Sequence, residues 1–420
     1  MAQQDSGKGR PNPPDFLVKE PKPMPLWMQY EQKVEEPLSA VTARLKQVGN
    51  QPFQIDTIQY NGVNAIDIVL MGDGYTDVEQ EKFSRDAKRC ISYLFEISPF
   101  NRYVSFFNVY ALHVLSQESG ISHPGVWQAN EEGTHTMRCP ENSKMPIITK
   151  KTFFGVSLDG WGVHRLTGMW NKQNARDLLR VYFPKCKVPG ILSNTEEYGG
   201  AGGEILIATC NGQSSEIYVH EFAHLFGDLA DEYFGGDVYI DEKPNMSRKG
   251  DSLSVRWRHW LDDEEVGIYP HHGSRQAEKT FKPTQATETS KYCKMEKLGK
   301  EFCPVCRERL VEAIHEQVNL IESASPLDTV LAPLSKSEKL TFSLEKIYRA
   351  KGNRCKITWF VDGKLWAADT TRISLSGKEL TPEKAHIVEV CVEDVCSFVR
   401  TGNHETFHTS KHRWNIARKR

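Results

Sequence analysis

Residues 65–76 read AIDIVLMGDGYT, and this stretch sets the fold class of the first large part of the chain. The run 65–71 is apolar except for Asp67, a pattern that predicts a buried strand. The strand should end at 72–74, where two glycines flank an aspartate and indicate a turn.

A helix is expected directly after this turn. Thr76 precedes Glu79 at the spacing of a capping box, so the helix should begin here and run to about Glu96. A second apolar run, FFNVYALHVL at 106–115, predicts the next strand. The order strand, helix, strand indicates an α/β domain that opens with a parallel pair.

Length and charge exclude several classes of protein. At roughly 150 residues per domain, 420 residues predict two or three domains. With 53 Lys and Arg against 55 Asp and Glu, the chain has no overall basic field for nucleic acid. No apolar stretch approaches the ~18–20 residues needed for a membrane span. We therefore expect neither nucleic acid nor a membrane span among the features of this protein.

The middle of the chain is less regular. Residues 120–200 are rich in Gly, Pro, Asn and Trp and are expected to be irregular. The sequence ILIATC at 205–210 predicts a short strand, and a long helix should start near Ser214. A final helix is expected to follow Pro304 and to continue to about Ile321.

Both ends of the chain differ from the middle. Residues 1–50 carry many prolines and predict an extended N-terminal arm. After Pro326 the composition changes, and short β-rich runs separated by turn signals predict a small β-sandwich over 326–420. These runs are 338–346, 355–361, 371–376 and 386–400. The last ten residues are strongly basic and are expected to form a solvated tail.

The sequence His220-Glu221-Phe222-Ala223-His224 carries the chemistry. On a helix, residues four apart lie on one face, so His220 and His224 can bind one metal ion. Glu221 lies beside them and can act as general base towards a water on the metal, then pass the proton to the leaving amine. The pattern predicts a zinc hydrolase site with Zn²⁺ as cofactor.

Two imidazoles rarely suffice for zinc, so a third ligand is expected. Asp231 is favoured, and it can reach the metal only if the helix ends near Gly227. Glu232, Asp228 and the distant Glu242 remain alternatives. Asp231 could instead orient one histidine without touching the metal.

The segment HEFAHLFGDLADEY at 220–233 resembles the active-site segment of the IgA-peptidase family of bacterial zinc metallopeptidases. Further blocks look similar, in the same order along the chain: IDIVLMGDGYT at 66–76, PFNRYVSFFNVYALHV at 99–114, EEYGGAGG at 196–203 and CKMEKLGKEFCPVC at 293–306. Leu225 and Gly227-Asp228 depart from the family pattern, but neither change touches the two histidines or Glu221.

This resemblance implies a metzincin-like, HExxH zinc endopeptidase of α/β (α+β) class that hydrolyses protein or peptide substrates. We accordingly divide the chain into an arm at 1–50, a zinc metallopeptidase catalytic domain at 51–325 and an Ig-like β-sandwich at 326–420. Such enzymes are usually exported, and C-terminal β-sandwich modules are familiar companions of them. The name of the family suggests immunoglobulin A as substrate, but a zinc motif does not transfer substrate identity.

We expect structural roles for Met295 and for the cysteines. The resemblance implies that Met295 lies in a turn beneath the metal, the alternative being an ordinary core methionine. Cys303-Pro304-Val305-Cys306 could be a redox motif or half a zinc knuckle. Because no second CxxC accompanies it, a disulfide that ties the Met295 turn to the last helix is favoured. Cys391 and Cys396 are expected to pair across a hairpin or to be buried thiols.

The sequence identifies the residues that contact the substrate less clearly than the metal ligands. The strand 205–210 is a candidate edge along which an extended peptide pairs, the alternative being a core strand. Candidate donors to a tetrahedral oxyanion are Tyr233, Tyr292, His271 and His272, and no spacing selects one of them.

Two rival functions remain open at this stage. One is a zinc hydrolase of a non-peptide amide in a cell wall or glycan, and the other is a non-catalytic secreted binding protein. An intact Glu221 argues against the second, since a structural metal needs no base. Residues 1–25 contain no apolar signal region, but 1–4 resembles the remnant of a cleavage site, so we expect a secreted, periplasmic or cell-surface protein.

Overall fold

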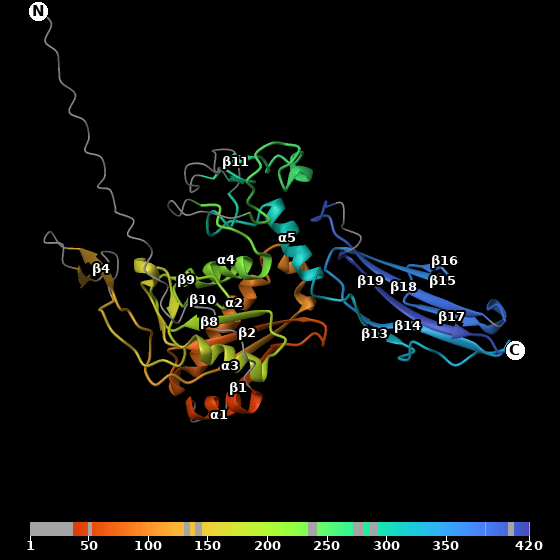
Figure 1. The fold of residues 1–420 in the computed structure, drawn as a ribbon, viewed down its shortest axis with the longest axis horizontal. Helices are drawn as coiled ribbons and strands as arrows, with labels where there is room; N and C mark the ends of the chain where they lie inside the picture. Colours follow the sequence, from red (N-terminus) through yellow and green to blue (C-terminus); the bar gives the residue numbers. More distant parts are fainter. Residues whose placement is uncertain are drawn as a thin grey trace, which may run out of the picture.

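The computed structural model describes residues 37–48, 53–129, 135–138, 145–233, 242–271, 280–285, 292–382, 384–401 and 407–419. The chain is a mixed α/β protein with several sheets and few helices. In Figure 1, the C-terminal strands lie at one end of the molecule and the largest sheet at the other. Within the described residues, no helix has the length and apolarity needed to cross a membrane.

A six-stranded sheet organises the first part. Its strands, in spatial order, are β1 (Gln54–Gln59), β3 (Phe107–His113), β2 (Ile66–Asp73), β8 (Val188–Ser193), β10 (Leu206–Thr209) and β9 (Gly200–Ala201). The inner strands β3, β2, β8 and β10 run parallel to one another. The edge strands β1 and β9 are antiparallel to their neighbours.

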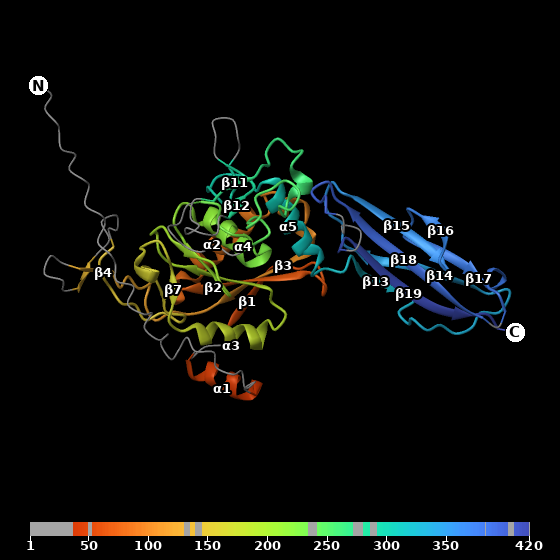
Figure 2. The same cartoon turned by 45° about the horizontal axis from the view of Figure 1, so that its top comes forward.

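Helices cover both faces of this sheet. Helices α2 (Gln80–Leu94) and α4 (Ser214–Gly227) lie on one face, and α1 (Leu38–Val48) and α3 (Lys172–Tyr182) lie on the other (Figures 1 and 2). The alternation in β2 explains this arrangement: Ile68 and Leu70 belong to the core beneath α2 and α4, whereas Val69 and Met71 belong to the core beneath α1 and α3. Since both faces are covered, the parallel strands read as continuous apolar runs.

The strand–helix–strand prediction is confirmed. β2 and β3 pair in parallel, and α2 follows the turn after β2. The backbone N–H of Thr76 donates to the Glu79 carboxylate over 2.9 Å, as the capping box requires.

Two expectations for this part are wrong. The arm at 1–50 lies largely outside the described residues, but Leu38–Val48 is the helix α1 rather than an extended segment. Residues 120–200 are not simply irregular, because they contain α3 and the central strand β8. Pro189 and Gly190 hid β8 from the pattern, since both residues are typical of breaks in strands. Gly190 fits there because Leu70 and Leu206 approach within 3.1 and 3.2 Å of where its Cβ would lie.

Small two-stranded sheets and 3₁₀ turns lie within the loops. The small two-stranded sheets are β4 (Val126–Ala129) with β5 (His135–Arg138), β6 (Val156–Ser157) with β7 (Gly168–Met169), and β11 (Tyr269–Pro270) with β12 (Phe281–Lys282). The 3₁₀ turns are Asp77–Glu79, Phe100–Arg102, Val104–Phe106, Gly160–Gly162, Arg258–Trp260 and Gly377–Glu379. Helix α5 (Pro304–His315) ends earlier than the expected Ile321, which instead begins β13.

The C-terminal part consists of two antiparallel sheets. One contains β13 (Ile321–Ser325), β14 (Lys339–Ile347) and β17 (Arg372–Ser376), and the other contains β16 (Lys364–Ala368), β15 (Arg354–Val361), β18 (Ala385–Val395) and β19 (Thr409–Ala417). Their side chains meet between the sheets, where the ring centroids of Phe342 and Trp414 lie 5.1 Å apart. Trp359 stacks on Trp414 at 5.9 Å, and all three side chains are buried.

Two C-terminal expectations fail as well. The basic tail is the strand β19, which pairs along its length with β18 and buries Trp414 and Ile416. Its basic residues hid the alternation of buried and exposed positions. Cys391 lies within the continuous strand β18 and Cys396 just beyond it, so no hairpin separates them and neither forms a disulfide. The alternative of free thiols holds, with Cys396 buried and Cys391 half-buried.

Candidate active site

Helix α4 carries His220, Glu221 and His224. It packs against α2 and β10, and most of its apolar residues are buried, Val219 and Phe222 completely. The helix is therefore held rigidly at the carboxyl end of β10, with its second half leading into the site. Ligands on a buried helix are positioned by the core rather than by a loop.

The turn after α4 brings the chain back towards the histidines. The helix ends at Gly227, and Asp228 adopts a left-handed conformation at φ 54° and ψ 33°. The Asp228 N–H donates to Ala223 O, which closes the last turn. Because the chain reverses here, Asp231 returns to the helix face that bears His220 and His224.

The three side chains converge on one point. Asp231 Oδ1 lies 2.9 Å from His220 Nε2 and 3.1 Å from His224 Nε2, and the two Nε2 atoms are 3.1 Å apart. Neighbouring ligand atoms of a tetrahedral zinc lie about 3.3 Å apart at bond lengths of roughly 2.0–2.1 Å. The spacing of the three atoms thus matches one face of a tetrahedral metal site.

Hydrogen bonds fix which ring nitrogens face this point. His220 Nδ1 lies 3.1 Å from the carbonyl oxygen of Lys294, and His224 Nδ1 lies 2.7 Å from that of Leu229. A carbonyl only accepts, so both Nδ1 atoms donate. Both Nε2 atoms then face the same carboxylate oxygen, where a shared proton links them in the absence of a metal and where a metal ion could take the place of that proton. These residues therefore fit a metal ion such as zinc.

The ionisation of these groups follows the same contacts. Burial opposes charge on His224, but the hydrogen bond to Asp231 and the negative charges of Asp231 and Glu221 together outweigh it and raise the pKa of His224 to about 9. Burial also disfavours an ionised Asp231, yet hydrogen bonds from both histidines hold its pKa well below the usual range. Asp231 is thus an anion ready to bind a cation.

Glu221 lies beside this trio without joining it. Within the described part of the chain its carboxylate forms no hydrogen bond or ion pair. Partial burial raises its pKa, although the charges of His220 and His224 oppose this effect. An unpaired carboxylate with a raised pKa is suited to accept a proton.

A glycine-rich strand covers Glu221. A Cβ added at Gly202 would lie 2.8 Å from Glu221 Oε2, and one at Gly200 would lie 2.4 Å from Ile217 on α4. Gly200 therefore lets β9 pack closely against the helix, and a side chain at position 202 would push the Glu221 carboxylate aside. The backbone of 200–203 borders the site directly.

The structure separates the alternative third ligands from the histidines. Asp228 pairs with Lys243 at the surface, and Glu242 pairs with Arg256. Glu232 points away and accepts hydrogen bonds from Asn245 and Thr284. Only Asp231 of these carboxylates lies beside both histidines, and its role as a metal ligand stays a prediction.

The turn around Met295 contacts the site through its backbone. Met295 is fully buried, and its carbonyl oxygen accepts the N–H of Glu232 over 2.8 Å. The neighbouring Lys294 orients His220 through its carbonyl and pairs its own ammonium with Glu216 at 2.6 Å. Sequence reasoning missed Lys294, whose only signal was its place beside Met295.

The candidate oxyanion donors separate in the structure. The ring of Tyr233 lies 6.3 Å from that of His220, with the guanidinium of Arg165 5.8 Å from its centroid. Burial and the charge of Asp231 raise the pKa of Tyr233 to about 12, so it is a neutral hydroxyl. His271 donates to the backbone carbonyl of Tyr233. Arg165 had no signal in the sequence.

Of the other two candidate donors, Tyr292 lies beneath Lys297 and Lys300, and His272 is outside the described residues.

Two further expectations need correction. The strand at 205–210 is β10, which lies one place inside the edge, because β9 pairs with it and forms the outermost strand. The expected disulfide between the Met295 turn and the last helix does not form, since Cys293, Cys303 and Cys306 are all free buried thiols.

A sequence model of one protein family, described as IgA Peptidase M64, matches residues 57–287. The match covers more than half of the chain and includes β2, α4 and the three converging side chains. It stops before Met295 and the cysteines at 293–306. A search of curated proteins finds no significant match.

Proposed function

Because this chain belongs to the IgA Peptidase M64 family, we propose that it is a zinc-dependent endopeptidase whose metal is held by His220, His224 and Asp231. Membership of the family supports a peptidase acting on protein or peptide substrates. The identity of the metal as zinc, its three ligands and the catalytic mechanism belong to our proposal and do not follow from family membership alone.

One observation carries the proposal. Two imidazole Nε2 atoms and one carboxylate oxygen converge within about 3 Å of one another, with both Nδ1–H groups already used by backbone carbonyls. Three protein ligands leave a fourth position for water or substrate, as catalytic zinc sites require.

The residues of this chain then have separate roles in the proposed reaction. Zinc, when bound, supplies a Lewis acid that lowers the pKa of water and polarises a carbonyl. Glu221 accepts the proton of the attacking water and delivers it to the leaving amine nitrogen. Tyr233, a neutral hydroxyl next to the guanidinium of Arg165, is placed to donate to the developing oxyanion.

An extended substrate is expected to pair with β9. This two-residue strand is the antiparallel outer edge of the sheet and borders Glu221. Backbone pairing gives affinity without demanding one side chain, which suits a protein substrate.

We propose the finer architecture on similar grounds. An HExxH helix, a tight turn to a third ligand and a buried methionine turn support a metzincin-like catalytic domain at 51–325. The two C-terminal sheets combine strands from alternating parts of the chain, which supports an Ig-like sandwich at 326–420. An exported location, secreted, periplasmic or at the cell surface, remains part of the same proposal.

The test compares Glu221→Gln with a matched control, Glu81→Gln, whose carboxylate is 95% exposed on α2. We expect purified wild type to cleave a denatured protein mixture in a zinc-dependent way. Glu221→Gln should keep its zinc and lose roughly 10²–10⁴-fold in kcat, because the general base is gone. The control should match wild type.

Zinc bound at the histidines without cleavage by any variant would contradict the endopeptidase and favour the non-peptide amide hydrolase. An unchanged zinc content in the double variant His220→Ala with His224→Ala, compared with wild type, would contradict the proposed metal site itself.

A further inference from the structure

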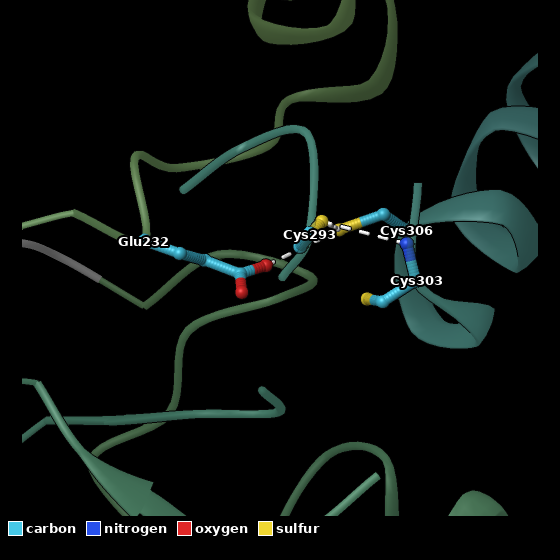
Figure 3. Close-up of side chains that lie close together, drawn as sticks. All are labelled: Glu232, Cys293, Cys303 and Cys306. Atoms are coloured by element: carbon cyan, nitrogen blue, oxygen red, sulfur yellow. Dashed lines mark hydrogen bonds between the residues drawn. The ribbon is translucent and has the colours of Figure 1, made fainter. Parts of the chain in front are cut away.

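Four metal-ligating side chains lie together on the far side of the Met295 turn. They come from three segments: Glu232 follows the turn after α4, Cys293 precedes Met295, and Cys303 and Cys306 begin α5. Figure 3 shows the Glu232 carboxylate pointing towards the cysteines. One ligand atom from each residue lies within 4.8 Å of all the others.

The distances match a tetrahedral zinc ion. Cys293 Sγ lies 3.6 Å from Cys306 Sγ, and Cys306 Sγ lies 3.4 Å from Glu232 Oε1. At Zn–S and Zn–O bond lengths of roughly 2.3 and 2.0 Å, tetrahedral geometry requires about 3.8 Å between sulfurs and about 3.5 Å between sulfur and oxygen. A disulfide would need sulfurs only about 2.05 Å apart.

The cluster is deeply buried. Glu232 is 1% exposed, Cys293 and Cys306 are 0% exposed, and Cys303 is 5% exposed. A carboxylate is costly to bury unless it is hydrogen-bonded or paired with a positive charge. A cation bound by all four side chains would pair the buried carboxylate.

Hydrogen bonds from the surroundings hold the carboxylate and one of the sulfurs in place. Asn245 Nδ2 donates to Glu232 Oε1 over 2.9 Å, and Thr284 Oγ1 donates to Oε2 over 2.6 Å. The backbone N–H groups of Met295 and Cys303 both donate to Cys293 Sγ at 3.4 Å.

The N-terminus of helix α5, which carries a partial positive charge, lies at the cluster. Cys303 is its N-cap and Pro304 lies in its first turn, so the partial positive charge at the helix N-terminus faces the cysteines. Outer contacts of this kind orient and tune metal ligands.

We propose that Cys293, Cys303, Cys306 and Glu232 bind a second zinc ion with a purely structural role. Three soft thiolates and one carboxylate select zinc over calcium or magnesium. Four protein ligands close the tetrahedron and leave no position for a substrate. Binding releases the thiol protons to solvent and changes no oxidation state.

The proposed structural zinc site is connected to the catalytic site through the backbone. Glu232 directly follows Asp231, and its N–H is bonded to Met295 O. The same turn supplies the Lys294 carbonyl that orients His220. A zinc ion that joins 232, 293 and the start of α5 therefore fixes both the proposed third catalytic ligand and the tautomer of a histidine.

The first test needs no mutation. The full chain, purified in the presence of zinc and then gel-filtered, is expected to contain two zinc ions per chain by plasma mass spectrometry. Loading with cobalt should give intense sulfur-to-cobalt charge-transfer absorption, which a histidine–carboxylate site cannot produce. Intact-peptide mass spectrometry without reductant should find Cys293, Cys303 and Cys306 unlinked.

Variants separate the two sites. Cys303→Ser with Cys306→Ser should lose one zinc ion and the charge-transfer band, whereas His220→Ala with His224→Ala should lose one zinc ion and keep the band. Cys391→Ser, at a half-buried thiol on β18, is the control and should change neither.

The outcomes separate this inference from the peptidase proposal. A single zinc ion removed by the histidine substitutions, with no charge-transfer band in wild type, would overturn the second site alone. A disulfide between any two of the three cysteines in the zinc-loaded protein would overturn it as well. Zinc retained only by the cysteines would instead overturn the catalytic metal.

Discussion

At the scale of single residues, the position of Asp231 decides the chemistry of the site. Its Oδ1 contacts both histidines, and it can do so because Asp228 ends the helix in a left-handed turn. Loss of a residue that only orients a ligand costs roughly 10–100-fold in metal affinity. We expect Asp231→Asn to weaken zinc binding at the histidine site by more than about 100-fold, measured by competition with a chelator.

The matched control is Asp228→Asn, three residues earlier, where the carboxylate is 65% exposed and pairs with Lys243. It should leave zinc affinity unchanged, since an amide side chain also tolerates the left-handed backbone. A loss of only about 10-fold in Asp231→Asn would assign Asp231 to orientation rather than to the metal.

Glu79 gives a second prediction at this scale, for the pH dependence of stability. Burial opposes its ionisation, but hydrogen bonds from Thr76, Ser119 and Asn194 outweigh it and lower the pKa of Glu79 from 4.5 to about 2. Its stabilising contribution is therefore complete above pH 4.5 and disappears as the pH falls towards 2.

Wild type should accordingly be more stable than Glu79→Gln near pH 6, and this difference should shrink near pH 3. Urea unfolding in the presence of a chelator measures it without a contribution from metal. The exposed Glu81→Gln should show no such pH-dependent difference. An advantage of wild type that is equal at both pH values would mean that the charge of Glu79 is irrelevant.

At the scale of elements, the close approach of the strand β9 to α4 shapes the site. A methyl group at Gly202 would lie 2.8 Å from Glu221 Oε2 and 3.5 Å from His224 Cβ. We expect Gly202→Ala to displace the Glu221 carboxylate and to lower kcat by roughly 10-fold or more, because catalytic groups tolerate little misplacement. Zinc content and thermal stability should stay near the wild-type values.

Gly212→Ala is the control, since a Cβ there meets nothing within 4 Å. Peptide hydrolysis and zinc analysis on the same samples distinguish the two variants. Full activity of Gly202→Ala would show that Glu221 is not confined by β9, and the proposed substrate edge would lose its support.

Sequence reasoning succeeded for elements whose signals are local. The apolar run of β2, the capping box at Thr76 and the HExxH spacing all lie within a few residues, so β2, α2 and α4 were predicted. The strand β8 was missed because Pro189 and Gly190 contradict strand propensity, and tertiary packing on Leu70 and Leu206 overrides that propensity. Tertiary contacts of this kind leave no trace in a single sequence.

The same limit applies to the sites. His220, Glu221 and His224 could be named because one helix spaces them. The cysteine cluster could not, since its fourth partner is Glu232, some sixty residues before Cys293, rather than a second CxxC. Arg165 reaches Tyr233 from another loop and had no signal at all.

At the scale of the whole molecule, the two large parts of the chain share a buried polar network. Asp394 on β18 accepts hydrogen bonds from Tyr103 at 2.8 Å and Asn353 at 3.0 Å, and His315 at the end of α5 lies 3.0 Å away. Glu308 on α5 accepts the backbone N–H of Arg400 in a similar way. The C-terminal sheets therefore hold the helix whose first turn carries Cys303 and Cys306.

The last prediction concerns this network. Asp394→Asn should lower the free energy of unfolding by about 2–3 kcal/mol, because a buried charge-assisted hydrogen bond is worth roughly 1.5–3 kcal/mol. Tyr103→Phe removes the same contact from the other side. We expect the double variant to be less destabilised than the sum of the two, with a coupling of about 1 kcal/mol measured by urea unfolding.

The control cycle uses Lys356→Met and Glu393→Gln, a surface ion pair that also involves β18 and has its atoms 2.9 Å apart. Its coupling should fall within about 0–1 kcal/mol, as is usual for exposed pairs. Additive effects of Tyr103→Phe and Asp394→Asn would mean that the contact does not link the two parts energetically. A coupled network would instead make the C-terminal sheets a structural support for α5, so that their removal should destabilise the cysteine cluster before it affects β2 or α2.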